Sequence, residues 1–401
     1  MSYRSVRDLD PKSRVVFLRV DFNVPLDGTS ITDDRRIRAS LPTIRLLAER
    51  GARVLCASHL GRPKGRRVAE LSLAPVARRL GELLGREVPF AEDCIGAPAA
   101  DLAARLGDGE VGLLENLRFH EGETKGDEAF ARALAAPADL FVNDAFGAAH
   151  RAHASVVGVP KVLGGGWVGL LMEKEIGALT RLVDAPERPY VAILGGAKVS
   201  DKIRLIERLT ERVDRILVGG AMAYTFLAAA GHPVGASRVE EDRLDLAREL
   251  AARAAERGVA LELPLDHVTA ARVEGHAVED LQTTDGVAIP DGRCGVDIGP
   301  RTLEHWRSLL GTDVRTVLWN GPVGLFEAAG AETGTRALAE HLAGLPAFVV
   351  LGGGDTAAAA RRFGLDDRFD HVSTGGGAAL ELLSGIDLPG LAALRLGEGG
   401  R

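Results

Sequence analysis

The stretch Tyr190–Lys202, YVAILGGAKVSDK, decides the fold class that we assign to this chain. Its five apolar residues predict a buried strand, and the two glycines after them predict a tight turn. An amphipathic helix is expected next, because apolar residues recur at spacings of three and four and so mark one buried face. These apolar residues are Val199, Ile203, Ile206, Leu209 and Val213. A strand, a turn and a helix in this order are typical of α/β proteins with parallel sheets.

Two lysines, Lys198 and Lys202, lie where this helix is expected to begin. A helix N-terminus disfavours a cation by about 0.3–1 kcal/mol, and like charges four residues apart repel by roughly 0.2–0.5 kcal/mol. The chain contains only seven lysines and takes most of its positive charge from arginine, so two lysines in one short turn stand out. An anionic ligand at this turn would offset both costs, because the helix dipole and both ammonium groups attract it.

The same order of strand, turn and helix recurs along the chain and predicts two doubly wound, Rossmann-like α/β domains with parallel sheets. The apolar runs of the first half are RVVFLRV (14–20), ARVLCA (52–57), EVGLL (110–114) and ADLFV (138–142). Those of the second half are YVAIL (190–194), DRILV (214–218), TVLW (316–319), AFVVL (347–351) and FDHVS (369–373). A helix-like segment that ends in a proline-containing turn separates the two sets. We expect domains over 1–171 and 188–385, joined by an interdomain helix and linker over 172–187.

Length, charge and cysteine content exclude several classes of protein. With 401 residues, of which 46% are hydrophobic and 26% charged, the chain is long enough for two globular domains. A net charge of −7 argues against nucleic-acid binding. No apolar run reaches the length of a membrane span, so we expect a cytoplasmic protein without a membrane partner. The cysteines Cys56, Cys94 and Cys294 lie far apart with no CxxC pair, which argues against disulfides and a zinc site and favours small buried side chains.

Positively charged side chains follow the apolar runs of the first half. In open parallel sheets, ligands bind beyond the carboxyl ends of the strands, so these positions are expected to face a ligand. The alternation in VVFLRVDFNVP places Arg19, Asp21 and Asn23 on one face at a strand end. The other candidates are Arg36, in the turn before a helix, and His59, Arg62, Arg118, His120, Arg151 and His153 after later runs. Guanidinium groups bind phosphate bidentately, so the set favours a pocket for a small phosphorylated molecule over ordinary solvated arginines.

Glycine-rich turns follow the apolar runs of the second half. They are LGGAK (194–198), VGGAMA (218–223), WNGPVG (319–324), LGGGDT (351–356) and STGGGA (373–378). Glycines let the backbone approach a ligand, and backbone N–H groups can hold phosphate oxygens, so five such turns predict a nucleotide-binding edge. The candidate contacts in these turns are Gly196, Ala197, Gly219, Gly220, Asn320, Pro322, Gly353 and Gly354. Asp355 suits a Mg²⁺ ligand or a helix cap, Thr356 a helix cap, and Glu327 a ribose contact or a surface carboxylate.

The standard nucleotide-binding fingerprints are missing. No G-x-x-x-x-G-K-[ST] sequence occurs, so the chain is not a P-loop protein. A G-x-G-x-x-G sequence occurs at Gly164, Gly166 and Gly169, but it follows no clear strand and has no acidic partner at the expected distance. We interpret it as a chance match.

Eight blocks of sequence, taken in order and spacing, resemble the phosphoglycerate kinase family. They are RVDFNVP (19–25), SHLGRP (58–63), LENLRFH (114–120), NDAFGAAHRAHAS (143–155), GGAKVSDKI (195–203), WNGPVGLFE (319–327), LGGGDT (351–356) and STGGGA (373–378). The resemblance runs from about Arg19 to LPGLAAL (388–394), which is nearly the whole chain. It implies a glycolytic, usually monomeric enzyme that moves a phosphoryl group reversibly between ATP and the carboxylate of 3-phosphoglycerate, giving ADP and 1,3-bisphosphoglycerate. It also implies Mg²⁺, hinge closure of the two domains, and a tail over about 386–401 that returns to the first domain.

The resemblance assigns roles to residues of this chain. The positions that match phosphoglycerate-binding residues are Asp21, Asn23, Arg36, His59, Leu60, Gly61, Arg62, Arg118 and Arg151. The positions that match nucleotide-binding residues are Lys202, Glu327, Gly353, Gly354, Asp355 and Thr356. Lys198 matches a lysine linked to the transferred phosphoryl group, and Asp355 matches a residue linked to Mg²⁺.

The mechanism that this resemblance implies needs no general base, because a carboxylate acceptor is already ionised at neutral pH. Catalysis then depends on positioning and charge stabilisation. We expect Arg36 and Lys198 to flank the transferred group, helped by the backbone N–H groups of Gly353 and Gly354 and by Mg²⁺ on Asp355.

Three alternative functions share part of this pattern. Another kinase that makes acyl phosphates would have the glycine turns but would not need the basic residues of the first half. An NAD-dependent dehydrogenase should show G-x-G-x-x-G directly after a strand. A non-catalytic nucleotide-binding protein could retain the motifs, although the complete set of charged positions argues against it.

Overall fold

The computed structural model describes residues 3–395, and they divide into two compact units. Among these residues, one unit is 3–177 with 387–395, and the other is Ala178–Ile386. The division falls inside helix α7 (Leu170–Asp184). Residues 396–401 of the expected tail lie outside the described residues, and the assignment of 172–187 as a linker stays a prediction.

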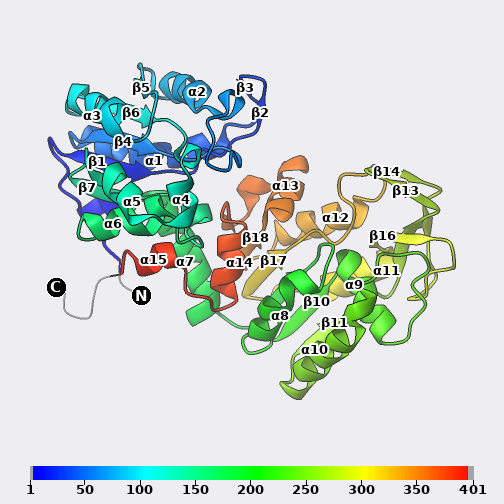
Figure 1. Cartoon of the computed structure of the whole chain (residues 1–401). Helices are drawn as coiled ribbons and strands as arrows, with labels where there is room; N and C mark the ends of the chain where they lie inside the picture. Colours follow the sequence, from blue (N-terminus) through cyan, green and yellow to red (C-terminus); the bar gives the residue numbers. More distant parts are fainter. Residues whose placement is uncertain (1–2, 396–401) are drawn as a thin grey trace. The chain divides into compact units, whose positions relative to one another are not determined.

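The first unit is built on a parallel sheet with the strand order β5-β6-β4-β1-β7-β8 (Figure 1). Its strands are β1 (Val15–Arg19), β4 (Arg53–Ala57), β5 (Phe90–Ala91), β6 (Val111–Leu114), β7 (Leu140–Asn143) and β8 (Trp167–Val168), with a hairpin of β2 (Leu26–Asp27) and β3 (Ser30–Ile31). Its helices, besides the first part of α7, are α1 (Arg35–Glu49), α2 (Ala74–Leu84), α3 (Gly96–Arg105), α4 (Glu121–Lys125), α5 (Glu128–Ala135), α6 (Val159–Val162) and α15 (Pro389–Ala392).

Helices cover both faces of this sheet, as Figure 1 shows. Alternate strand residues such as Val16 and Leu18 share one core cluster with apolar residues of α1 and α2. All five residues of β1 are buried, including Arg19 at its end. The prediction that Arg19, Asp21 and Asn23 share one face of a strand is therefore wrong: the strand stops at Arg19, and a doubly covered parallel strand has no solvated face.

The second unit has a parallel sheet with the strand order β11-β10-β9-β17-β18-β19 (Figure 1). Its strands are β9 (Tyr190–Leu194), β10 (Arg215–Val218), β11 (Ala260–Glu262), β17 (Thr316–Asn320), β18 (Phe348–Gly352) and β19 (His371–Val372). Its helices, besides the end of α7, are α8 (Ile203–Leu209), α9 (Gly220–Ala229), α10 (Leu244–Glu256), α11 (Pro300–Leu309), α12 (Thr333–Leu342), α13 (Gly354–Arg362) and α14 (Gly377–Leu383).

Antiparallel strands between β11 and α11 were not predicted from the sequence. They are β12 (His267–Ala270), β15 (Gln282–Thr283) and β16 (Cys294–Ile298) in one sheet, with the hairpin β13 (Arg272–Glu274) and β14 (Ala277–Glu279). Several of these strands have only two or three residues, which is too short for an alternation pattern to be recognised.

Both parallel sheets confirm the predicted doubly wound α/β class, and each apolar run quoted above contains a strand. The G-x-G-x-x-G sequence follows α6 instead of a strand, which confirms that it is not a dinucleotide fingerprint. Every helix among residues 3–395 is too short or too polar to span a bilayer.

The helix after the GGAK turn begins later than predicted. A 3₁₀ turn, η6 (Ser200–Lys202), comes first, and α8 starts at Ile203 with Lys202 as its N-cap. Lys198 lies in the loop before η6, so neither lysine is inside the helix. The physical reason is a carboxylate from another segment: Glu240 accepts the backbone N–H groups of Val199 (2.6 Å) and Ser200 (3.1 Å), which stabilises a tighter turn.

Candidate active site

Hydrogen bonds join most of the predicted substrate residues of the first unit into one cluster, which we call the basic cluster. Its members are Asp21, Asn23, Arg36, His59, Leu60, Gly61 and Arg118. Arg36 Nη1 donates to Asp21 Oδ2 (2.6 Å), and Asn23 N–H donates to Asp21 Oδ1 (3.2 Å). The N–H of Gly61 donates to Asn23 Oδ1 (2.8 Å), which ties the loop after β4 to the loop after β1.

Arg36 is the second residue of α1, one step later than the predicted turn. Its ion pair with Asp21 fixes the guanidinium at the start of this helix. Burial tends to raise the pKa of Asp21, but interactions with His59, Arg36 and Arg19 and the N–H of Asn23 outweigh that effect and hold it below the usual value. Asp21 is therefore ionised and neutralises part of the local positive charge.

Arg118 adds a positive charge that no described carboxylate pairs directly. Its Nη1 donates to Gly61 O (2.8 Å), and its backbone N–H donates to Asn116 Oδ1 (3.1 Å). Burial, together with the nearby charges of Arg19 and Arg151, lowers its pKa to about 10. Like charges held this close favour a bound anion, which would relieve their repulsion.

Arg19 and His59 do not supply free positive charge, which corrects the sequence interpretation of this pair. Arg19 is fully buried and donates to Ser155 Oγ (2.9 Å), to the carbonyl of Val20 and to His59 Nδ1 (3.1 Å). Burial lowers the pKa of His59 to about 3, so its imidazole is neutral at pH 7. Nδ1 therefore accepts from Arg19, which leaves the proton on Nε2.

Glu123 and Asn116 support this cluster and were missed by the sequence interpretation. Glu123 is fully buried, accepts the hydroxyl of Ser155 (2.6 Å) and its N–H (2.9 Å), and raises the pKa of Arg19 against the effect of burial. Asn116 Oδ1 also accepts the N–H of Leu60 (3.2 Å). Glu123 lies 32 residues from Ser155, so no local spacing announces their contact.

Arg151 and Arg62 are linked to the basic cluster less directly. Arg151 Nε lies 3.1 Å from His150 Nε2, and its charge acts on Arg118. Arg62 is exposed and forms no hydrogen bond or ion pair with the rest of 3–395. Arg62 follows Gly61 in the chain, but no hydrogen bond or ion pair among residues 3–395 links it to the basic cluster. Its role stays a prediction.

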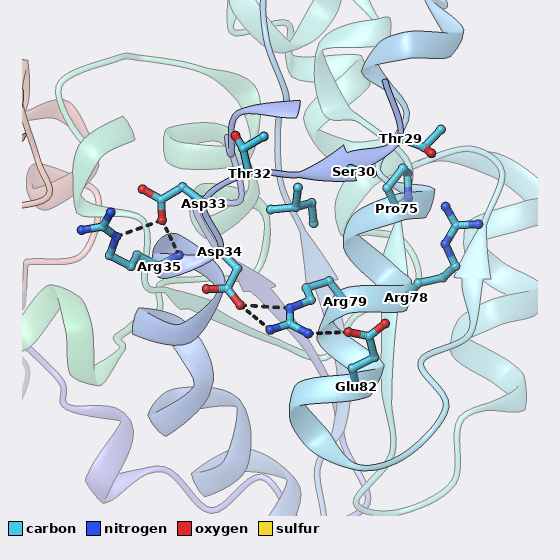
Figure 2. Close-up of a pocket in the computed structure, with 11 residues that line it drawn as sticks. Thr29, Ser30, Thr32, Asp33, Asp34, Arg35, Pro75, Arg78, Arg79 and Glu82 are labelled. Atoms are coloured by element: carbon cyan, nitrogen blue, oxygen red, sulfur yellow. Dashed lines mark hydrogen bonds and ion pairs between the residues drawn. The ribbon is translucent and has the colours of Figure 1, made fainter. Parts of the chain in front are cut away.

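A separate cavity of about 480 Å³ in the first unit lies beside this region and is shown in Figure 2. Its acidic groups already have partners: Arg79 donates to Asp34 (2.7 Å) and pairs with Glu82, and Arg35 donates to Asp33 (2.9 Å). The Asp34–Arg79 pair joins the start of α1 to α2. We interpret it as support for the helix that carries Arg36.

The second unit has a cavity of about 440 Å³ at the carboxyl ends of its strands. β9 and β17 are neighbours where the strand order reverses, which is the usual ligand position in doubly wound sheets. The predicted residues that line the cavity are Gly196, Ala197, Gly220, Pro322, Glu327 and Asp355. Those outside its lining are Lys202, Gly219, Asn320, Gly353, Gly354 and Thr356.

An apolar part of this cavity was not predicted. It is lined by Tyr224, Val273, Val296, Leu325 and Phe326, with Arg238 and Cys294 among the other lining residues. Val273, Cys294 and Val296 come from the unpredicted antiparallel strands, whereas Tyr224, Leu325 and Phe326 directly follow two of the glycine turns. Cys294 is only partly buried and its thiol faces Ala236 O (3.1 Å), whereas Cys56 and Cys94 are buried as expected.

Two of the glycine turns use their N–H groups to bind other turns, whereas the sequence predicted that these groups would hold phosphate oxygens. Gly196 N–H donates to Pro322 O (3.0 Å) and Gly220 N–H donates to Val323 O (2.9 Å), so these amides are not free for a phosphate. Gly220 has φ +64°, and a Cβ there would lie 2.6 Å from Gly196 N. Glycine is required because three strand ends meet at backbone contact distance.

The start of α13 is the clearest anion site in this unit. Its N-cap is Gly353, with φ +88°, and no side chain caps the helix. The first amides of a helix have no intrahelical acceptor, and the helix dipole adds positive potential there. Thr356 is fully buried: its hydroxyl accepts Gly321 N–H (2.6 Å) and donates to Gly352 O (2.7 Å), so it holds the neighbouring turns together.

Asn320 and Lys202 lie together at the end of β17. Lys202 Nζ donates to Asn320 Oδ1, and burial lowers the pKa of this ammonium to about 8. The amide Nδ2 of Asn320 is buried and has no hydrogen-bond partner among residues 3–395. It lies close to Gly352 and Gly353, where a Cβ would be 2.9 and 3.4 Å away. A ligand oxygen at this position would give this buried donor an acceptor.

The first unit has a cluster of guanidinium groups, and the second has a cavity at the carboxyl ends of its parallel strands. This combination is typical of a phosphotransferase that acts on a small anionic metabolite.

Comparisons with known proteins narrow this class to one family. A family model described as phosphoglycerate kinase matches residues 6–386. Proteins named phosphoglycerate kinase from Anaeromyxobacter dehalogenans (strain 2CP-C) and Anaeromyxobacter sp. (strain K) are each 52% identical over 396 residues, 98% of this chain and 99% of theirs. The solved phosphoglycerate kinase of Coxiella burnetii has a TM-score of 0.89 at 40% identity and covers 98% of this chain and 99% of its own. That of Pyrococcus horikoshii OT3 has a TM-score of 0.84 at 34% identity and covers 98% of both chains.

The chain therefore belongs to the phosphoglycerate kinase family. Its activity is phosphoryl transfer with a carboxyl group as acceptor, and it uses a nucleotide substrate. The predicted family, enzyme class and fold are confirmed, and the dehydrogenase alternative is not supported.

Proposed function

We propose that the basic cluster binds 3-phosphoglycerate or 1,3-bisphosphoglycerate, and that the cavity of the second unit binds ATP or ADP with Mg²⁺. The observation that carries the nucleotide assignment is the unpartnered Nδ2 of Asn320 beside Lys202 and the uncapped start of α13. A phosphate chain at this place would satisfy all three. The apolar side chains of the same cavity would then hold the base, and Glu327, which forms no hydrogen bond within 3–395, would reach a ribose hydroxyl.

Asp355 is suited to hold Mg²⁺. Its side chain is exposed at the first turn of α13, lines the cavity, and makes no hydrogen bond or ion pair with the rest of 3–395. A free carboxylate oxygen beside a phosphate site fits a hard cation that prefers oxygen ligands. Bound Mg²⁺ would neutralise charge on the nucleotide phosphates.

The transfer step rests on positioning and charge stabilisation. Asp21 fixes the Arg36 guanidinium, so that it meets the acceptor side of the transferred group without reorganising. Lys198 is exposed in the loop before η6, and Glu240 holds the end of that loop through two backbone N–H groups. The backbone N–H groups of Gly353 and Gly354 add donors at the start of α13. The domain closure and the monomeric state that the family resemblance implies stay predictions.

The test is a coupled assay of ATP consumption with 3-phosphoglycerate that also detects the acyl phosphate. Acetate and aspartate serve as control acceptors, because another acyl-phosphate kinase would use one of them. We expect turnover with 3-phosphoglycerate only. Turnover with a control acceptor, or none with 3-phosphoglycerate, would contradict the proposed substrates.

Variants then test the proposed roles. Arg36→Ala and Lys198→Ala are expected to lower kcat more than about tenfold, which corresponds to about 1.4 kcal/mol of transition-state stabilisation. Lys174→Ala is the matched control, because Lys174 lies in α7, away from both proposed sites in sequence. Wild-type turnover in either site variant would refute its assigned role.

A further inference from the structure

Asp93, Cys94 and His120 bring three different metal-ligating atoms together outside the sites described above. A carboxylate oxygen, a thiol sulfur and an imidazole nitrogen of these residues all lie within 4.8 Å of one another. Asp93 and Cys94 lie in the loop between β5 and α3, and His120 follows Asp93 by 27 residues. The sequence argued against a zinc site because no cysteine pair has zinc-type spacing. The fold builds a ligand set from two separate segments instead.

The geometry of the three groups is already organised. Asp93 Oδ1 accepts the N–H of Cys94 (2.6 Å) and lies 2.7 Å from His120 Nε2. The imidazole packs beside the ring of Phe130, with the ring centroids 5.1 Å apart, which fixes its orientation. Side chains held in place before binding lose little conformational freedom when an ion arrives.

The cluster is partly exposed to solvent. Cys94 is fully buried, while the side chains of His120 and Asp93 are 31% and 34% exposed. An ion from solvent can therefore reach the carboxylate and the imidazole first, with the sulfur behind them. The carboxylates of Asp93 and Glu123 both act on the Cys94 sulfur, and each favours a cation there.

We propose that Asp93, Cys94 and His120 form a binding site for a thiophilic divalent cation such as Zn²⁺. Cysteine, histidine and aspartate are its usual ligands, and a water molecule can supply the fourth position of a tetrahedron. A sulfur ligand selects such ions over Mg²⁺, which prefers oxygen. When the cation binds sulfur, the Cys94 thiol releases its proton to solvent, and His120 coordinates as the neutral imidazole.

The competing explanation is a hydrogen-bonded cluster that never binds metal. Burial and the nearby carboxylates keep the pKa of the Cys94 thiol well above its usual value, so the metal-free cluster holds a thiol. Metal binding itself therefore decides between the two explanations.

The experiment is a titration of the metal-free, full-length protein with Co²⁺. Tetrahedral Co²⁺ bound to a thiolate gives strong visible and near-ultraviolet absorption, whereas Co²⁺ on exposed carboxylates gives weak bands. We expect one Co²⁺ per chain with a thiolate band, displaced by Zn²⁺ but not by Mg²⁺. Cys94→Ser should abolish the band and weaken binding more than about tenfold. Cys294→Ser, which removes a thiol from the other unit, should leave both unchanged.

Two further variants keep the test decisive where Cys94→Ser fails to fold. Asp93→Asn and His120→Asn change partly exposed side chains, and each should weaken Co²⁺ binding while the thiolate band persists at saturation. A wild-type protein without a thiolate band overturns the proposal. So does a band that survives in Cys94→Ser, or binding that neither Asp93→Asn nor His120→Asn weakens.

Discussion

The partly buried Lys202 predicts that nucleotide binding weakens at alkaline pH. Burial lowers the pKa of its ammonium to about 8 in the free protein. A nucleotide polyphosphate beside it stabilises the charged form and returns the pKa towards its ordinary value of about 10.4. Below pH 8 the free protein already carries this proton. Above pH 8 the proton must be taken up on binding, so the affinity falls as pH rises.

The two pKa values set the size of the effect. The dissociation constant scales inversely with the fraction of free protein that carries the proton, so Kd at pH 9 should be about tenfold higher than at pH 7, or about 1.4 kcal/mol weaker. At pH 8 about half a proton should be taken up per nucleotide bound. The terminal phosphate of the nucleotide, with a pKa near 6, is already ionised over this range and adds little.

Isothermal titration calorimetry of ADP without Mg²⁺ measures both quantities. Titrations at pH 7, 8 and 9 give Kd, and two buffers of different ionisation enthalpy give the proton uptake. Lys202→Arg is the matched control, because arginine remains protonated throughout and should flatten the pH dependence. Circular dichroism at each pH checks that the protein stays folded. Equal affinity at pH 7 and pH 9, or the same slope in Lys202→Arg, would refute the position of the phosphate chain beside Lys202.

Two further predictions concern the turns that shape the nucleotide cavity. Gly220→Ala should destabilise the protein by about 1–3 kcal/mol more than Gly275→Ala in urea unfolding, because both positions have positive φ (+64° and +58°) but only at Gly220 does an added Cβ meet backbone atoms. An equal loss of stability in the two variants would mean that the strand-end turns can move apart to admit the added Cβ. Glu240→Gln should lower kcat about tenfold with the overall fold intact, because an amide donor replaces one acceptor of the Val199 and Ser200 N–H groups and loosens the Lys198 loop. Unchanged kcat would show that this carboxylate does not position Lys198.

The order of elements could be read from the sequence because it depends on local patterns. Apolar runs, as in YVAILGGAK, located most strands of both parallel sheets, since a strand buried on both faces needs a continuous apolar run. They missed β5, β8 and β11, which have only two or three residues each. The same logic predicted candidate ligand-binding residues, because strand ends of a parallel sheet meet at one edge. Arg118, Asp355 and Asn320 were proposed in this way, and their roles stay predictions.

Only the tertiary structure determined the charge state and the hydrogen-bond partners of several of these residues. Burial depends on neighbours that are distant in sequence, so the sequence could not show that His59 is neutral, that Arg19 is enclosed by Ser155 and Glu123, or that Lys202 holds its proton weakly. Backbone contacts between separate strand ends decided that Gly196 and Gly220 pack against other turns. The proximity of Asp93 and Cys94 to His120 likewise depends on contact between segments that are distant in sequence. Local periodicity determines which element a residue belongs to, whereas charge, hydrogen-bond partners and access to ligands follow from what the folded chain places around it.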